Sequence, residues 1–294
     1  MKKRFIILSV WLTCLASCFL NSSCDGPKQM DRTATQQIEV EEQARLEDAT
    51  ASSPACKMKI DFSYLTAGVP DAAGQVDSIA RIINQTVQER VLGKAFASLT
   101  PTAAVDSFKQ AYIDHYRREV NEFYLEDRKN GVSDENLPSW YNYEYGLTSS
   151  FEPGKEGILN YQAETFEYTG GAHPNSWGQW FNFDLATGQI LTLKDVFLGG
   201  SDRPLCELLL QELITEMSER LEDPELKTLE GLQEAGVLNS TPMYVSDNFL
   251  LTKDHVAFLY NKYDIAPYAV GSITLSLSYE TIEKYLKKET QQKQ

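Results

Sequence analysis

Hydrophobic and polar residues follow regular spacings along most of the chain from residue 57 onward. Met58, Ile60, Phe62 and Tyr64 alternate with polar neighbours, and this period of two predicts a half-buried strand. The same alternation predicts further strands at 141–147, 159–165, 177–185, 244–251, 255–260 and 273–279. A Pro153-Gly154 turn is expected to join the strands at 141–147 and 159–165.

Other stretches carry apolar residues three and four positions apart, which predicts amphipathic helices. They cover 76–95, 105–123 and 205–221, and Thr100-Pro101 is a typical start for the second helix. Shorter helices are expected within 223–242 and at 280–288. Runs of strands separated by helices favour an α+β fold with two lobes of antiparallel sheet packed with amphipathic helices. We place the N-terminal α+β domain at 57–175 and the C-terminal α+β domain at 176–288.

The first residues have the features of an export signal. A basic start at Lys2, Lys3 and Arg4 precedes an apolar stretch that is too short to span a membrane. Leu-Ala-Ser-Cys at 15–18 resembles a bacterial lipobox, so residues 1–17 are predicted to be a lipoprotein signal peptide and Cys18 the lipidated residue. A plain secretory signal and lipidation of Cys24 are the alternatives.

Residues 18–56 lack apolar periodicity and are rich in Gln, Glu, Asp, Ser, Thr and Ala. Such a composition buries too little apolar surface to offset the conformational entropy of the chain. We therefore expect a flexible tether over 18–56, with a short helix at 36–48 as the competing interpretation.

Charge and histidine content exclude several classes of protein. The chain has 27 Lys and Arg against 42 Asp and Glu, a net charge of −15, and removal of residues 1–17 makes it −18. This balance argues against binding to nucleic acid and against adhesion to anionic lipid surfaces. The three histidines, His115, His173 and His255, are far apart in the sequence, so neither a metal site nor a cofactor is expected.

Cys56 and Cys206 could form a disulfide in an oxidising compartment or remain free thiols.

Three segments carry a resemblance to a known group of proteins. They are YTGGAHP at 168–174, FNFDLATGQILTLKDVF at 181–197 and YNKYDIAPYAVG at 260–271. Together they resemble a family of exported bacterial proteins with two adjacent domains of unknown function. Its members include the lysozyme-sensing ectodomain of the anti-sigma-V factor and the non-catalytic N-terminal region of a peptidoglycan N-acetylglucosamine deacetylase.

The resemblance implies an α+β fold for both domains and no catalytic residues within them. The deacetylase members place their chemistry in an additional metal-dependent domain, whose T-F-D-D-G and H-x-x-x-H motifs this sequence lacks. Binding of a sigma factor is not implied either, since a lipoprotein signal stands where those members have a cytosolic segment and a transmembrane helix.

Candidate ligand-binding residues lie in two of these segments. They are Tyr168, Gly170, Gly171, His173, Tyr260, Tyr263 and Tyr268. Paired glycines allow backbone to approach a ligand closely, and tyrosines offer rigid area with a polar tip. The alternative is that the glycines form a tight turn and the tyrosines pack on their own loop. A second aromatic group, of Trp140, Tyr141, Tyr143, Trp177 and Trp180, could stack on sugars or fill the core of a sheet.

The sequence thus favours a lipid-anchored, non-catalytic binding module exported to the bacterial cell envelope. Its expected partner is a basic protein such as lysozyme, because a strongly acidic body attracts cationic proteins. Peptidoglycan or another carbohydrate is the alternative partner, and an enzyme of unrecognised type is the third possibility.

Overall fold

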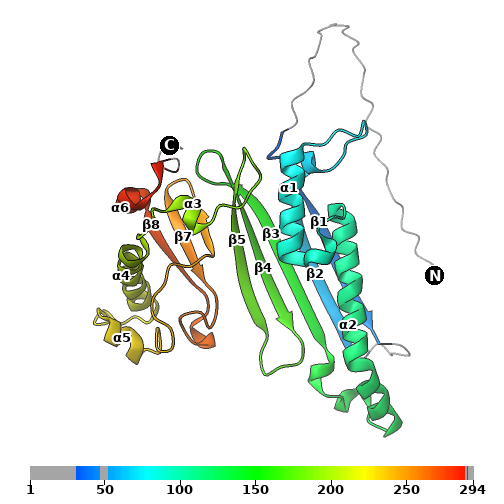
Figure 1. The fold of residues 1–294 in the computed structure, drawn as a ribbon. Helices are drawn as coiled ribbons and strands as arrows, with labels where there is room; N and C mark the ends of the chain where they lie inside the picture. The colour runs from blue at the N-terminus through cyan, green and yellow to red at the C-terminus, as the bar shows by residue number, and fades with distance from the viewer. Residues whose placement is uncertain (1–30, 47–51, 289, 291–294) are drawn as a thin grey trace, which may run out of the picture. The chain divides into compact units, whose positions relative to one another are not determined.

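The computed structural model describes residues 31–46, 52–288 and 290, and they fold around two β-sheets. The first lobe is a five-stranded sheet with two helices on one face, and the second lobe is a three-stranded sheet packed with further helices (Figure 1). The α+β class predicted from the sequence is confirmed. Among the described residues, no helix is both long and apolar enough to cross a membrane.

The first lobe contains β1 (Thr35–Arg45), β2 (Ala55–Leu65), α1 (Ser78–Val87), α2 (Pro101–Lys129), β3 (Tyr143–Pro153), β4 (Ile158–Tyr168) and β5 (Asn175–Asp184). Its strands lie in the order β1-β2-β3-β4-β5, so β1 and β5 are the edges. The β2–β3 pair is parallel, which corrects the expectation of an antiparallel sheet at this position. The physical reason is the connection, since α1 and α2 carry the chain back to the end at which β2 began.

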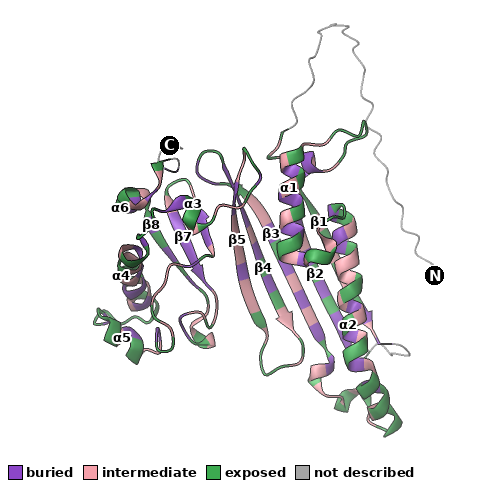
Figure 2. Cartoon of the chain, in the orientation of Figure 1, coloured by how far each residue is buried: buried purple, intermediate pink, exposed green. Residues whose placement is uncertain are grey.

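The core of this lobe lies between α1, α2 and one face of the sheet. Met58, Ile60 and Phe62 of β2 are buried, as their alternation predicts, and the intervening residues point to the other face (Figure 2). Aromatic rings of α2 and β3 meet in this layer: the ring centroids of Tyr112 and Tyr145 are 4.9 Å apart.

The second lobe contains α3 (Leu193–Val196), α4 (Asp202–Arg220), α5 (Leu229–Glu234), β6 (Phe249–Leu251), β7 (His255–Tyr260), β8 (Ile273–Ser278) and α6 (Tyr279–Ile282). Its antiparallel sheet has the order β6-β7-β8. Leu205, Leu209, Leu213 and Met217 of α4 are buried against it, as their spacing predicts. The strand expected over 244–251 is shorter than predicted, because only Phe249–Leu251 pairs with β7.

The predicted tether over 18–56 is wrong where the structure describes a strand. Residues Thr35–Arg45 pair with β2 along their whole length, so neither the flexible tether nor the competing helix at 36–48 describes them. The strand escaped prediction because, as an edge strand with polar faces, it is fixed by backbone pairing more than by burial. The rest of 18–56 is described only for 31–34, 46 and 52–56, and the signal peptide over 1–17 lies outside the described residues.

The predicted domain boundary between 175 and 176 is also wrong. It falls at the start of β5, which is hydrogen-bonded to β4 and belongs to the five-stranded sheet. A boundary there would split the β4–β5 hairpin.

Of the two alternatives for Cys56 and Cys206, the structure has the free thiols. Cys56 lies in β2 and Cys206 in α4.

Candidate functional site

The edge strands of the two sheets, β5 and β6, are joined through asparagine side chains. Asn182 donates its Nδ2 hydrogen to the carbonyl of Phe249 at 2.8 Å and accepts from the amide of Leu251 at 2.6 Å. In the opposite direction, Asn248 accepts from the amide of Trp180 at 2.7 Å and donates to the carbonyl of Gly178 at 2.8 Å. A carboxamide has one acceptor and one donor group side by side, so it can take the place of a partner strand.

A third asparagine extends this contact. Asn261, which follows β7, accepts from the amide of Gly178 at 2.7 Å and donates to its carbonyl at 3.0 Å. A Cβ at Gly178 would lie 2.5 Å from a methyl carbon of Leu259, so a larger residue there would require the Leu259 side chain to move. We call Asn182, Asn248 and Asn261 the asparagine seam.

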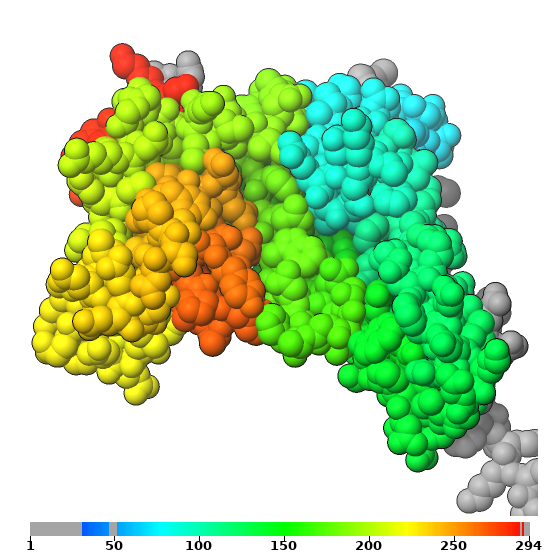
Figure 3. All heavy atoms as spheres, turned by 60° about the horizontal axis from the view of Figure 1, so that its bottom comes forward, coloured from blue at the N-terminus to red at the C-terminus, as the bar shows by residue number. Residues whose placement is uncertain are grey.

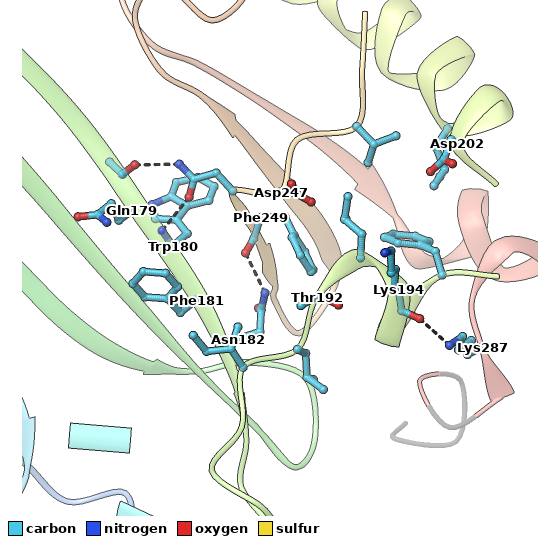
Figure 4. Close-up of a pocket in the computed structure, with 18 of the residues that line it drawn as sticks. Gln179, Trp180, Phe181, Asn182, Thr192, Lys194, Asp202, Asp247, Phe249 and Lys287 are labelled. Atoms are coloured by element: carbon cyan, nitrogen blue, oxygen red, sulfur yellow. Dashed lines mark hydrogen bonds between the residues drawn. The ribbon is translucent and has the colours of Figure 1, made fainter. Parts of the chain in front are cut away.

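A cleft of about 1010 Å³ lies along this seam. Its walls come from β5, from the segment 190–200 that contains α3, and from residues 245–249 (Figure 4). Arg90, in the π-helical segment Gln88–Leu92 that follows α1, lines the side toward the first lobe, and Lys287 lines the side near the C-terminus. Figure 3 shows the surface hollowed over the green segment, between the cyan and orange segments. The volume is at the upper end of the range for ligand sites.

Aromatic rings and amides dominate the lining of the cleft. The aromatic members are Trp177, Trp180, Phe181, Phe197 and Phe249. Trp177, Gln179 and Phe181 alternate along β5 and therefore share one face of the strand. The charged members are Arg90, Lys194, Asp202, Asp247 and Lys287. Apolar surface with a few convergent polar groups can stack against a flat ligand and hydrogen-bond to its edges.

The α3 wall is fixed by local hydrogen bonds. Asp195 accepts from the backbone amide of Thr192 at 2.8 Å and from its hydroxyl at 2.6 Å. These bonds favour the ionised carboxylate and lower the pKa of Asp195 below its usual value. Lys287 donates to the carbonyl of Lys194, which ties the end of the chain to the same wall (Figure 4).

Three of the sequence-predicted site residues come together outside the cleft. The ring of His173 stacks on the ring of Tyr268 with centroids 4.0 Å apart, and its Nε2 lies 3.2 Å from the hydroxyl of Tyr263. Tyr268 donates its hydroxyl hydrogen to the carbonyl of Pro174 at 2.9 Å, and Lys262 Nζ lies 4.5 Å from the centre of the Tyr268 ring. We call His173, Tyr263, Tyr268 and Lys262 the aromatic cluster.

The other predicted site residues have different surroundings. Tyr260 is fully buried and donates to the carbonyl of Tyr244 at 2.6 Å, and burial raises the pKa of its phenol. Gly170 has φ +88° and lies against Trp140, so it serves a close backbone approach. Tyr168 ends β4, paired with Glu144, and Gly171 lies between the Gly170 turn and His173. None of the contacts described for these four places them in the aromatic cluster.

The second aromatic group divides between core and cleft. Tyr141 and Tyr143 are buried in the first lobe, and Trp140 packs on Tyr141. Trp177 and Trp180 line the cleft, consistent with the alternative of a stacking surface. Sequence reasoning missed the asparagine seam and the walls at 190–200 and 245–249. The Thr192-Leu-Lys-Asp195 capping pattern was the one local signal for the α3 wall.

Within the described residues, no group of three or more His, Cys, Asp or Glu side chains could hold a metal ion. The predicted lipidation sites, Cys18 and Cys24, lie outside the described residues.

Comparison with known proteins identifies one domain. Residues 194–280, from α3 to α6, match the family described as "Protein of unknown function (DUF3298)" and form a DUF3298 family domain. A solved structure of a DUF3298 family member from Bacteroides fragilis NCTC 9343 is 29% identical with a TM-score of 0.75, over 86% of this chain and 93% of that chain.

A second solved structure, of a DUF3298 family protein from Pseudomonas aeruginosa PAO1, has a TM-score of 0.58 and 15% identity. It covers 88% of this chain and 97% of that chain, and at this identity the likeness concerns the fold alone. No curated protein matches the chain.

Proposed function

We propose that this protein is a non-catalytic binding module of the bacterial cell envelope and that its cleft holds a carbohydrate, such as a fragment of peptidoglycan. The observation that carries this proposal is the row of Trp177, Gln179 and Phe181 along one wall of the cleft. The apolar faces of a sugar ring pack well on aromatic side chains, while its hydroxyl and acetamido groups need amide partners.

A binding role suits the lining better than catalysis does. The described residues that line the cleft include no histidine, cysteine, serine or tyrosine, and their carboxylates are Asp202 and Asp247. An enzyme acting in this cleft would depend on that pair for acid and base chemistry. Hydrolysis of a bound glycan that disappears on Asp202→Asn or Asp247→Asn substitution would therefore refute the non-catalytic part of the proposal.

The test is a calorimetric titration of the purified protein with peptidoglycan disaccharide-peptides and N-acetylglucosamine oligomers. We expect Trp177→Ala to weaken binding about tenfold, equivalent to about 1.4 kcal/mol, because it removes a stacking surface. Tyr64→Ala is the matched control, since Tyr64 lies on β2, three strands away from β5, and bonds to Gln36. Equal affinities of the two variants, or no binding of any glycan to the parent protein, would refute the proposal.

A basic protein such as lysozyme is the second candidate partner. The net charge of −15 favours it, because an acidic protein attracts cationic partners over several ångströms. Lysozyme would bind tightly at low salt and weakly at high salt, whereas a glycan held by stacking would bind with little dependence on salt.

We further propose that the chain is an exported lipoprotein with lipid on Cys18, supported by the Leu-Ala-Ser-Cys motif at 15–18. Metabolic labelling with a palmitate analogue should mark the parent protein and Cys24→Ala but not Cys18→Ala. Labelling lost only in Cys24→Ala would move the anchor to Cys24, and an unlabelled parent would exclude it.

A further inference from the structure

The aromatic cluster is built by two loops that are distant in sequence. The loop after β4 provides His173 and the loop after β7 provides Tyr263, 90 residues later. Stacking of His173 on Tyr268 and the contact between His173 Nε2 and the Tyr263 hydroxyl hold the two loops together. This contact also spans the two lobes, because β4 belongs to the first sheet and β7 to the second.

Tyr263 is displayed on the surface by a fixed turn. Tyr263 is 60% exposed, more than any other large hydrophobic residue in the described part of the chain. Its backbone has φ +71°, a left-handed conformation that is rare for a residue with a large side chain. Asn261 donates its backbone amide to Asp264 Oδ2 at 2.7 Å and accepts from the backbone amide of Asp264 at 3.0 Å. Tyr263 donates its own backbone amide to the carbonyl of Ala266 at 3.1 Å. A strained, exposed aromatic residue held by its neighbours is typical of a ligand contact.

The cluster begins where the lining of the cleft ends. Lys262 donates to the hydroxyl of Ser176 at 2.7 Å. Ser176 precedes Trp177 in β5, and Lys262 follows Asn261, and both Trp177 and Asn261 line the cleft. On both chain segments the two features are thus one residue apart, about 3.8 Å between consecutive Cα atoms.

We infer that the aromatic cluster is a second subsite for the glycan that occupies the cleft, so that the ligand is an extended oligosaccharide. This inference rests on the proposed function. A linear chain that leaves the cleft past Trp177 and Asn261 reaches Ser176 and Lys262 next, and then the exposed rings of Tyr263 and His173. Those rings offer apolar faces with polar edges, which are the same groups that suit a sugar in the cleft.

The experiment measures affinity as a function of oligomer length, using the N-acetylglucosamine disaccharide and hexasaccharide in calorimetric titrations of the whole folded protein. For the parent we expect the hexasaccharide to bind about tenfold more tightly than the disaccharide. Tyr263→Ala and, independently, His173→Ala should abolish this gain and leave the affinity for the disaccharide unchanged, because the short ligand stays in the cleft. Tyr64→Ala should keep the full gain.

Each other result decides against the inference. Equal affinities for both lengths, or a length gain that survives in Tyr263→Ala and His173→Ala, would show that the cluster does not bind the glycan while leaving the cleft as a binding site. Either of these two results is expected if the aromatic cluster contacts a protein partner instead of the glycan. Failure of both oligomers to bind the parent would overturn the cleft proposal and this inference together.

Discussion

Side-chain amides do at the junction of the two lobes what backbone amides do within a sheet. The asparagine seam provides hydrogen-bond partners for backbone N–H and C=O groups on the facing edges of β5 and β6. Each asparagine makes two hydrogen bonds to backbone groups of the other lobe. Because Asn182 is 1% exposed, water cannot replace its bonds. The junction is therefore specific as well as stable, since each carboxamide requires both a donor and an acceptor in register.

Replacing Asn182 with alanine should destabilise the protein. The amide of Leu251 and the carbonyl of Phe249 would lose their partners in a buried position, at a cost of about 1–3 kcal/mol for each group left unpaired. Urea unfolding measures the change in the free energy of unfolding. Asn136→Ala is the control, because the Asn136 side chain hydrogen-bonds to the Ser133 hydroxyl in an exposed position, and its effect should stay within about 0.5 kcal/mol. Similar losses in the two variants would contradict the role assigned to the asparagine seam.

Among the elements, α1 depends on a capping residue that also ties down the start of the described chain. Asp77 accepts from the backbone amide of Ala80 at 2.8 Å and forms an ion pair with Arg32 at 2.9 Å. Arg32 in turn donates to the carbonyl of Leu185 at 2.8 Å, so one carboxylate links α1, the segment before β1 and the turn after β5. The hydrogen bond from Arg32 is the main reason that the pKa of Asp77 lies below its usual value.

Asp77→Ala should lower the free energy of unfolding by about 1–2 kcal/mol near neutral pH, because the helix loses its cap. The folded-state pKa is lowered, so the carboxylate contributes stability above the unfolded-state pKa and loses it as the pH falls through the folded value. The difference in the free energy of unfolding between parent and variant should therefore shrink as the pH falls below 3.8, the ordinary pKa of an aspartate side chain. Unfolding curves at several pH values check this, with the exposed Glu156→Gln as the control. A difference that stays constant down to pH 2 would contradict the account.

Prediction from sequence succeeds where an element buries one of its own faces. The alternation of β2 and the spacing of α4 both reflect contact with a core, and both elements were predicted. β1 was missed because its residues Thr35–Arg45 present polar side chains and gain their structure from eleven backbone pairs with β2. Residues 244–248 looked like a strand, yet Ser246 and Asn248 use their side chains to bond to β5 and β7.

For the whole molecule, the central feature is a cleft formed where two sheets meet at their edges. Its lining comes from segments near residues 90, 180, 195, 247 and 287, which no local pattern connects. The sequence could indicate the aromatic residues of β5 and the loops of the aromatic cluster. It could not indicate that Asn182 and Asn248 would place β5 beside β6, because their partners are backbone groups that any residue possesses.

The most direct measurement of the central claim is amide and indole chemical-shift mapping by NMR during titration with soluble peptidoglycan fragments. We predict that the shift changes concentrate on Trp177–Asn182, on the segment 190–200 and on residues 245–249, and that the Trp177 indole shows one of the largest changes. The Trp140 indole, which packs on Tyr141 in the first lobe, should remain unchanged. Shift changes confined to α2 or to the β1 edge would contradict a glycan-binding cleft between the two lobes. The absence of shift changes at a saturating concentration of fragment would contradict it as well.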